Sequence, residues 1–213
     1  SYNFVADETV SEDYVTANVN WTPSPRTSLL AGYSQRFFGD SYDFMFNHST
    51  RRLTNSMSYN ESLTSFDRNN FQAVDGNLEP IESREFSLNK RFSWQSRLQL
   101  SRTSFGINLS ANEREGLDTN VVDYNMDAGL TITRNISPSS NLSLSTTFRF
   151  SEFDKDNPEG SRQTDYYRTH MITYAKSLAL SLSTNFNLQH VNRNSTNEKY
   201  SYNEIRAVIN IKK

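Results

Sequence analysis

Charged side chains recur at alternate positions in several segments, among small polar residues. Arg91 and Arg97, for example, share the odd positions of the segment 86–100 with Ser, Asn and Gln. Alternate residues of a strand share one face, so such charges can pair across strands or form a polar track for a hydrated or anionic substrate. The residues expected on this polar face are Arg36, Asp43, Glu85, Arg91, Arg97, Asp123, Asp127, Arg149, Glu204 and Arg206.

Catalytic and metal-binding patterns are not found. His48, His170 and His190 lie on different expected elements, without the spacing of metal ligands. The sequence has no cysteine, no glycine-rich phosphate loop and no nucleophile elbow. The acidic run 154–160 lacks the glycine position and the distal glutamate of a calcium loop. We therefore expect no enzymatic activity, no cofactor and no metal.

Composition favours a β protein. The 213 residues are enough for one domain, which we expect to span 1–213. Mean hydropathy is −0.73 and only 35% of residues are hydrophobic, values that also occur in disordered chains. However, 13% of residues are aromatic, and much of the polar content is Ser, Asn and Thr, which is typical of strands. A net charge of −2 argues against nucleic-acid binding.

Hydrophobic periodicity defines the expected elements. In the segment 86–100, Phe86, Leu88, Phe92, Trp94, Leu98 and Leu100 all fall on even positions. Strict alternation over this length predicts a strand with two different faces, longer than the ~5–6 residues usual in soluble domains. Comparable strands are expected at 14–21, 27–37, 41–48, 53–64, 104–111, 122–133, 142–150, 164–175, 178–189 and 204–212, with one more possible at 1–6. The expected total is 11 or 12.

Two kinds of connection alternate along the chain. Short turns are expected at 22–26, 49–52, 101–103, 137–140 and 176–177, and longer polar loops at 65–82, 113–120, 154–163 and 191–199. Short turns at one end and long loops at the other are typical of an antiparallel up-and-down transmembrane β-barrel in the bacterial outer membrane. The apolar face would then contact lipid and the polar face would line the interior. Lys90 is an exception, because it lies on the apolar face and must reach an interface or another subunit.

A resemblance adds to this interpretation. The motifs Trp21-Thr22-Pro23-Ser24-Pro25-Arg26-Thr27, Arg36-Phe37-Phe38-Gly39-Asp40-Ser41-Tyr42 and His48-Ser49-Thr50-Arg51-Arg52 resemble the PEP-CTERM-system-associated outer-membrane β-barrel family, which occurs with exopolysaccharide and exosortase genes. Leu88-Asn89-Lys90-Arg91-Phe92 and Ile136-Ser137-Pro138 resemble the C-terminal half of that family. The resemblance implies that an N-terminal portion of the barrel precedes this chain.

Three functional hypotheses follow. The resemblance implies a conduit or scaffold for export of extracellular polysaccharide, with outer-membrane lipids, polysaccharide and periplasmic export components as partners. An alternative is a porin-like sheath around a multihaem electron conduit, although the chain has no haem-attachment motif. The remaining alternative is a soluble β-sandwich adhesin, because the strands of a sandwich also alternate between a buried face and a wet one.

Overall fold

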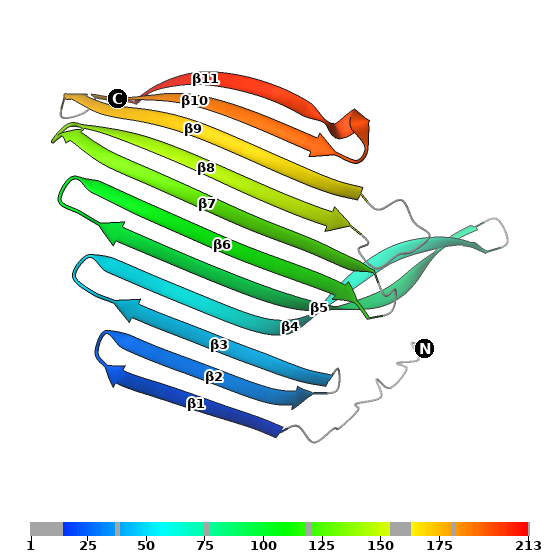
Figure 1. Cartoon of the computed structure of the whole chain (residues 1–213). Helices are drawn as coiled ribbons and strands as arrows, with labels where there is room; N and C mark the ends of the chain where they lie inside the picture. Colours follow the sequence, from blue (N-terminus) through cyan, green and yellow to red (C-terminus); the bar gives the residue numbers. More distant parts are fainter. Residues whose placement is uncertain are drawn as a thin grey trace.

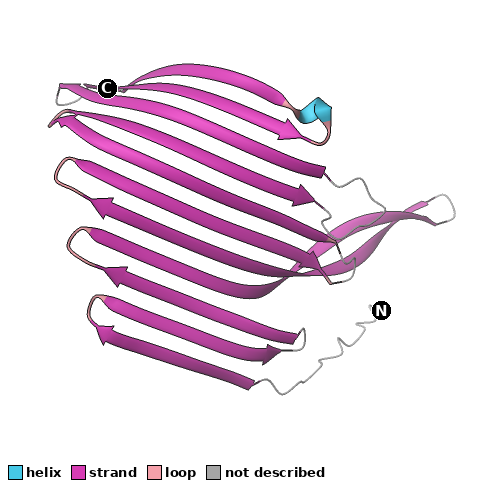
Figure 2. Ribbon diagram, in the orientation of Figure 1, coloured by secondary structure: helices cyan, strands magenta, loops and turns pink. Residues whose placement is uncertain are grey.

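The computed structural model describes residues 15–36, 39–74, 77–117, 121–153, 163–179 and 182–212. They form one antiparallel sheet of eleven strands in which each strand pairs with the next along the chain (Figures 1 and 2). The strands are β1 (Val15–Ser24), β2 (Thr27–Arg36), β3 (Gly39–Ser49), β4 (Leu53–Val74), β5 (Asn77–Gln99), β6 (Thr103–Gly116), β7 (Val122–Ser137), β8 (Ser140–Phe153), β9 (Gln163–Ala179), β10 (Leu182–Ser195) and β11 (Tyr202–Lys212). One short 3-10 helix, η1 (Glu198–Tyr200), precedes β11.

The turns at one end of the sheet are short and hydrogen-bonded. The Thr50 backbone N–H donates to the Leu53 carbonyl at 2.7 Å, and the Leu100 N–H donates to the Thr103 carbonyl at 2.8 Å. At Pro138, where the chain turns between β7 and β8, the Ser137 and Ser140 hydroxyls lie 2.7 Å apart. Backbone and side-chain hydrogen bonds together thus stabilise the turns. We call this the turn end of the sheet and the opposite end the loop end.

The loop end differs from expectation in several places. The loop predicted at 65–82 is wrong, because β4 continues to Val74 and β5 begins at Asn77. Figure 1 shows these two strands projecting together beyond their neighbours. The predicted loops at 113–120 and 191–199 begin too early, since β6 and β10 continue to Gly116 and Ser195. At the turn end, β9 continues to Ala179, past the turn predicted at 176–177. The possible strand at 1–6 lies outside the described residues.

The strand register sorts side chains onto two faces of opposite character. Trp94, Leu109, Ala128 and Phe148 are successive cross-strand partners from β5 to β8 and therefore share one face, the apolar face. One residue along, the partners are Gln95, Asn108, Gly129 and Thr147, on the opposite, polar face. This two-residue period is the pattern that the sequence predicts.

The sheet has no covered core. Val122 is the one hydrophobic side chain that is buried among the described residues. Large apolar side chains stay open, including Leu144 at 46% exposure and Phe148 at 48%. A sandwich would bury such residues against a second sheet, so the sandwich hypothesis is wrong for the described part of the chain. None of the described residues form a helix that is long and apolar enough to cross a membrane.

Both edges of the sheet are open. In the described residues β1 pairs only with β2, β11 pairs only with β10, and no pairing joins β1 to β11. The outer edges of these two strands therefore carry backbone N–H and C=O groups without a neighbouring strand. Hydrocarbon offers such groups no hydrogen-bond partner, so in a bilayer each edge requires a pairing strand.

The two faces predict unequal losses of stability when an arginine is introduced on one strand. Leu144→Arg in the full-length protein should lower the free energy of unfolding by about 2–4 kcal/mol, because the apolar face of β8 lies in lipid near the bilayer midplane. Ser145→Arg, one residue away on the polar face, should change it by about 0.5 kcal/mol or less. Urea unfolding of protein refolded into phosphatidylcholine vesicles measures both. Equal losses for the two variants would contradict the assignment of the faces.

Candidate functional site

The polar face is the candidate functional site, and small uncharged side chains cover most of it. On β5, Ser93 and Gln95 separate Arg91 from Arg97, and the facing residues of β6 are Asn108 and Ser110. Glycine recurs on this face: Gly32 lies opposite Asp43, Gly106 opposite Arg97, and Gly129 opposite Asn108. A Cβ at Gly129 would collide with the Asn108 amide, so this glycine lets the amide lie across its backbone. The wall is thus thin, polar and closely packed.

The register places on this one face the eight expected polar-face residues whose side chains are described. The structure brings two pairs of them together: Arg149 Nε lies 2.6 Å from Asp127 Oδ1 across β7 and β8, and Arg206 contacts Glu204 at 2.5 and 2.8 Å within β11. Asp127 and Arg149 are direct cross-strand partners. These ion pairs are open to solvent, with the Arg149 side chain 57% exposed, and such pairs contribute about 1 kcal/mol or less to stability.

The other expected residues are dispersed along the same face. Asp43 lies opposite Gly32 and Asn60, Arg91 lies opposite Asn60 and Asn112, and Asp123 lies opposite Arg114. Arg97 lines a shallow hollow with Gln95 and Asn108. For Arg36 and Glu85 only the backbone is described, in β2 and β5. The eight residues whose side chains are described therefore form no single cluster.

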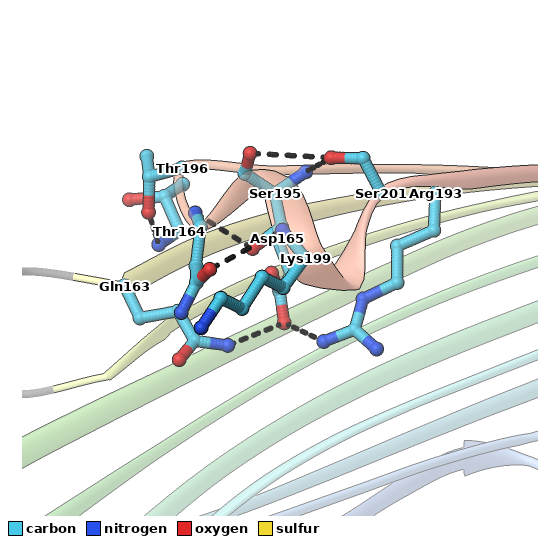
Figure 3. A network of polar contacts seen from close by, with 9 residues as sticks. Gln163, Thr164, Asp165, Arg193, Ser195, Thr196, Lys199 and Ser201 are labelled. Carbon is cyan, nitrogen blue, oxygen red and sulfur yellow. Dashed lines mark hydrogen bonds and ion pairs between the residues drawn. The ribbon is translucent and has the colours of Figure 1, made fainter.

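A cluster that the sequence did not predict lies at the loop end of β9, β10 and β11. Arg193 Nη2 donates to Asp165 Oδ2 at 2.7 Å, and Gln163 Nε2 donates to the same oxygen at 3.2 Å (Figure 3). The Asp165 side chain is 3% exposed and that of Arg193 is 19% exposed. Because a buried charge is stable only when it is paired and hydrogen-bonded, this network defines the shape of the hairpin end.

Aromatic rings surround the guanidinium of Arg193. Its Cζ lies 5.0 Å from the centroid of the Tyr167 ring and 5.2 Å from that of Tyr200, distances typical of cation–π contacts. Tyr202 is the cross-strand partner of Arg193 on β11, and it is 44% exposed. In the strands, the aromatic side chains that the register places on the described polar face are Phe153, Tyr167 and Tyr202, all near this end. We call Tyr167, Arg193, Tyr200 and Tyr202 the tyrosine–arginine cluster.

Hydrogen bonds hold the chain between β10 and β11 beside this cluster. The Ser195 N–H donates to Ser201 Oγ at 3.0 Å, and the Thr164 N–H donates to Thr196 Oγ1 at 3.0 Å (Figure 3). Asn197 caps η1 by accepting from the Lys199 N–H. The segment that carries Tyr200 is therefore fixed to both β9 and β10. These hydrogen bonds hold Tyr200 in place beside the strands that carry Tyr167 and Tyr202.

Comparisons with known proteins support the fold. No family model matches the chain, and no curated protein matches it. Among solved structures, OmpT of Vibrio cholerae folded in vitro aligns with a TM-score of 0.55 at 10% identity, covering 92% of this chain and 61% of OmpT. Its loop L8 deletion mutant aligns at 0.58 and 9% identity, over 92% of this chain and 61% of that one.

An anion-selective porin from Comamonas acidovorans aligns at 0.53 and 8% identity, over 92% of this chain and 57% of the porin. The sheet has a porin-like fold. A porin-like wall and a continuous exposed apolar face place the protein in the bacterial outer membrane, in contact with lipid. The chain spans about 61% of the length of OmpT. Barrels of this kind are usually not enzymes.

The buried network predicts unequal costs for removing two arginines. Arg193→Gln leaves the Asp165 carboxylate buried without its cation, and the free energy of unfolding should fall by about 3 kcal/mol. Arg149→Gln removes an exposed partner of Asp127 and should cost less than about 1 kcal/mol. Urea titration of both full-length variants in the same vesicles provides the comparison. If Arg193→Gln costs no more than Arg149→Gln, the network does not stabilise the hairpin end.

Proposed function

We propose that this protein forms a water-filled conduit through the outer membrane for export of extracellular polysaccharide. The observation that carries the proposal is the character of the polar face, where hydroxyl and amide side chains dominate and the charges are of both signs. A hydrated sugar polymer can exchange hydrogen bonds with such a surface. Because the charges are of both signs, no strong electrostatic attraction would hold the polymer in place. The resemblance to the exopolysaccharide-associated barrel family supports the same substrate class.

The tyrosine–arginine cluster supports a saccharide in particular. Tyr200 and Tyr202 are 47% and 44% exposed, although they lie at the polar side of the sheet. The flat face of a phenol ring packs well against the C–H face of a sugar ring, and the phenol hydroxyl remains free to hydrogen-bond. On this proposal the cluster is the last contact of the polymer at the loop end, which is extracellular in barrels of this kind.

We further propose that this chain forms part of the wall of a larger barrel. Support comes from the two open edges of the sheet and from the share of each porin that the chain spans. Additional strands beside β1 and β11 would satisfy the backbone groups at both edges. A periplasmic export component would deliver the polymer to the turn end of the barrel.

Deletion of the gene in the native bacterium should abolish secreted polysaccharide, and the wild-type gene should restore it. Tyr202→Ala should reduce secretion severalfold, because it removes a ring on which a sugar can stack; the comparable stacking of a nucleic-acid base on one aromatic ring contributes about 1–3 kcal/mol. Tyr166→Ala is the matched control: Tyr166 lies on the apolar face and is exposed to a similar degree, at 50%. Polysaccharide is measured in the medium by sugar analysis, and barrel assembly by heat-modifiable migration in gels. Normal secretion in the deletion strain would overturn the proposed function.

A further inference from the structure

The apolar face changes character at a similar height on many strands. Lys90 lies nine residues from Gln99, the last residue of β5, and His170 lies nine residues from Ala179, the last residue of β9. With a rise of about 3.3 Å per residue and a tilt of about 40°, nine residues cover about 23 Å of membrane thickness. The apolar band of an outer-membrane barrel is about 25 Å tall. These residues therefore lie where hydrocarbon gives way to headgroups, at the loop end.

The boundary on β4, β5 and β6 is acidic, and its lysine is paired within the protein. Lys90 Nζ lies 3.0 Å from Glu113 Oε1 and 3.5 Å from Glu115 Oε2. The Tyr59 hydroxyl donates to Glu61, whose other carboxylate oxygen accepts from the Tyr42 N–H at 3.2 Å. Lys90, the exception on the apolar face, is thus paired with carboxylates of the neighbouring strand. This part of the boundary has no cation to offer a lipid.

The boundary on β8 to β11 has the opposite character. His170 and His190 are cross-strand partners, with rings within 9° of parallel and centroids 6.0 Å apart. His170 Nδ1 lies 3.1 Å from Thr146 Oγ1, and His190 Nε2 lies 2.7 Å from Asn203 Oδ1. These contacts fix both rings and use one nitrogen of each. The other two nitrogens, Nε2 of His170 and Nδ1 of His190, have no hydrogen bond with a described residue.

Arg168 brings a permanent positive charge to the same place. It lies two residues from His170 on β9, and its cross-strand partners are Phe148 and Asn192, so the register places it on the apolar face. Arg168 is exposed, and no carboxylate in the described ranges lies within ion-pair distance of it. An arginine facing lipid without a counter-ion is costly. At the level of the headgroups, a lipid phosphate is the anion that lies within its reach.

We propose that Arg168, His170 and His190 form a binding site for the phosphate group of an outer-leaflet lipid. The guanidinium donates two parallel hydrogen bonds to phosphate oxygens, which a planar fork of N–H groups suits well. The free Nε2 of His170 donates a further hydrogen bond from one side when it carries the ring proton. Asn203 Oδ1 accepts from His190 Nε2, so Nδ1 of His190 donates to the phosphate only when the ring is an imidazolium. Phe148 and the apolar rows below it lie against the acyl chains. Charge complementarity selects a phosphorylated headgroup over a neutral one.

The test uses the full-length protein in non-ionic detergent, titrated with diphosphoryl lipid A and, separately, with the same lipid after enzymatic removal of its phosphates. We expect wild-type protein to bind the phosphorylated lipid and to bind the dephosphorylated lipid at least tenfold more weakly. Arg168→Gln should weaken binding of the phosphorylated lipid about tenfold, since a charge-assisted hydrogen bond contributes more than about 1.4 kcal/mol. Arg134→Gln is the matched control, because Arg134 is exposed on the apolar face at the turn end. It should leave the affinity unchanged.

Three results would overturn the proposal. Equal affinity for the two lipids would mean that acyl chains alone drive binding. Full displacement of the lipid by millimolar inorganic phosphate would mean that the site holds a free anion rather than a lipid headgroup. A change in oligomeric state on Arg168→Gln with unchanged lipid affinity would mean that the patch contacts another subunit. Far-ultraviolet circular dichroism confirms that each variant is folded, and His170→Ala, which retains Arg168, should still prefer the phosphorylated lipid.

Discussion

Hydrogen bonding of the backbone in a medium without water is the constraint on which this structure depends. Hydrocarbon offers no partner to an N–H or C=O group, so every residue that crosses the membrane must pair with a neighbouring strand. The meander meets this requirement for nine of its eleven strands, which have a neighbour on both sides. The sheet can then remain one layer thick, because lipid covers one face and water the other. Hydrophobic burial between layers, which holds most soluble domains together, is replaced by pairing along the strands.

The same arrangement explains where charge is tolerated. Ion pairs such as Asp127–Arg149 and Glu204–Arg206 lie on the polar face. Water there solvates the charges, so the desolvation penalty is small and the contribution of each pair to stability is small as well. On the apolar face, described charges lie toward the ends of the strands: Lys90 at the loop-end boundary has two carboxylates within 3.5 Å, and Arg134 is exposed at the turn end. The buried pair Asp165–Arg193 lies at the end of its strands and fixes a hairpin. The place of a charged pair in the sheet therefore decides how much the pair contributes to the stability of the fold.

The two-residue period made the fold, the outer-membrane class and the two faces predictable, because alternation is a property of single residues and needs no tertiary information. Strand ends were predicted less well. Residues 65–82 are polar and contain Pro80, and this composition favours a loop, yet β4 and β5 pair through this region. Arg193 fell in the loop predicted at 191–199 and Tyr200 directly follows that loop, so their contacts with Asp165 and Tyr167 were not predicted. The adjacent pair Tyr166-Tyr167 was the available signal, since it places one ring on each face of β9.

A wall one residue thick also has a consequence for evolution. Odd and even positions of each strand meet different solvents, so selection for anchoring acts on one set of residues and selection for cargo acts on the other. Either set can drift without disturbing its neighbour, provided that polarity is kept, because the backbone pairing does not depend on side-chain identity. This independence is consistent with a backbone that superposes on porins at TM-scores of 0.53 to 0.58 while sharing only 8 to 10% of its residues with them. The shape of such a wall can therefore be kept while nearly every side chain on it is replaced.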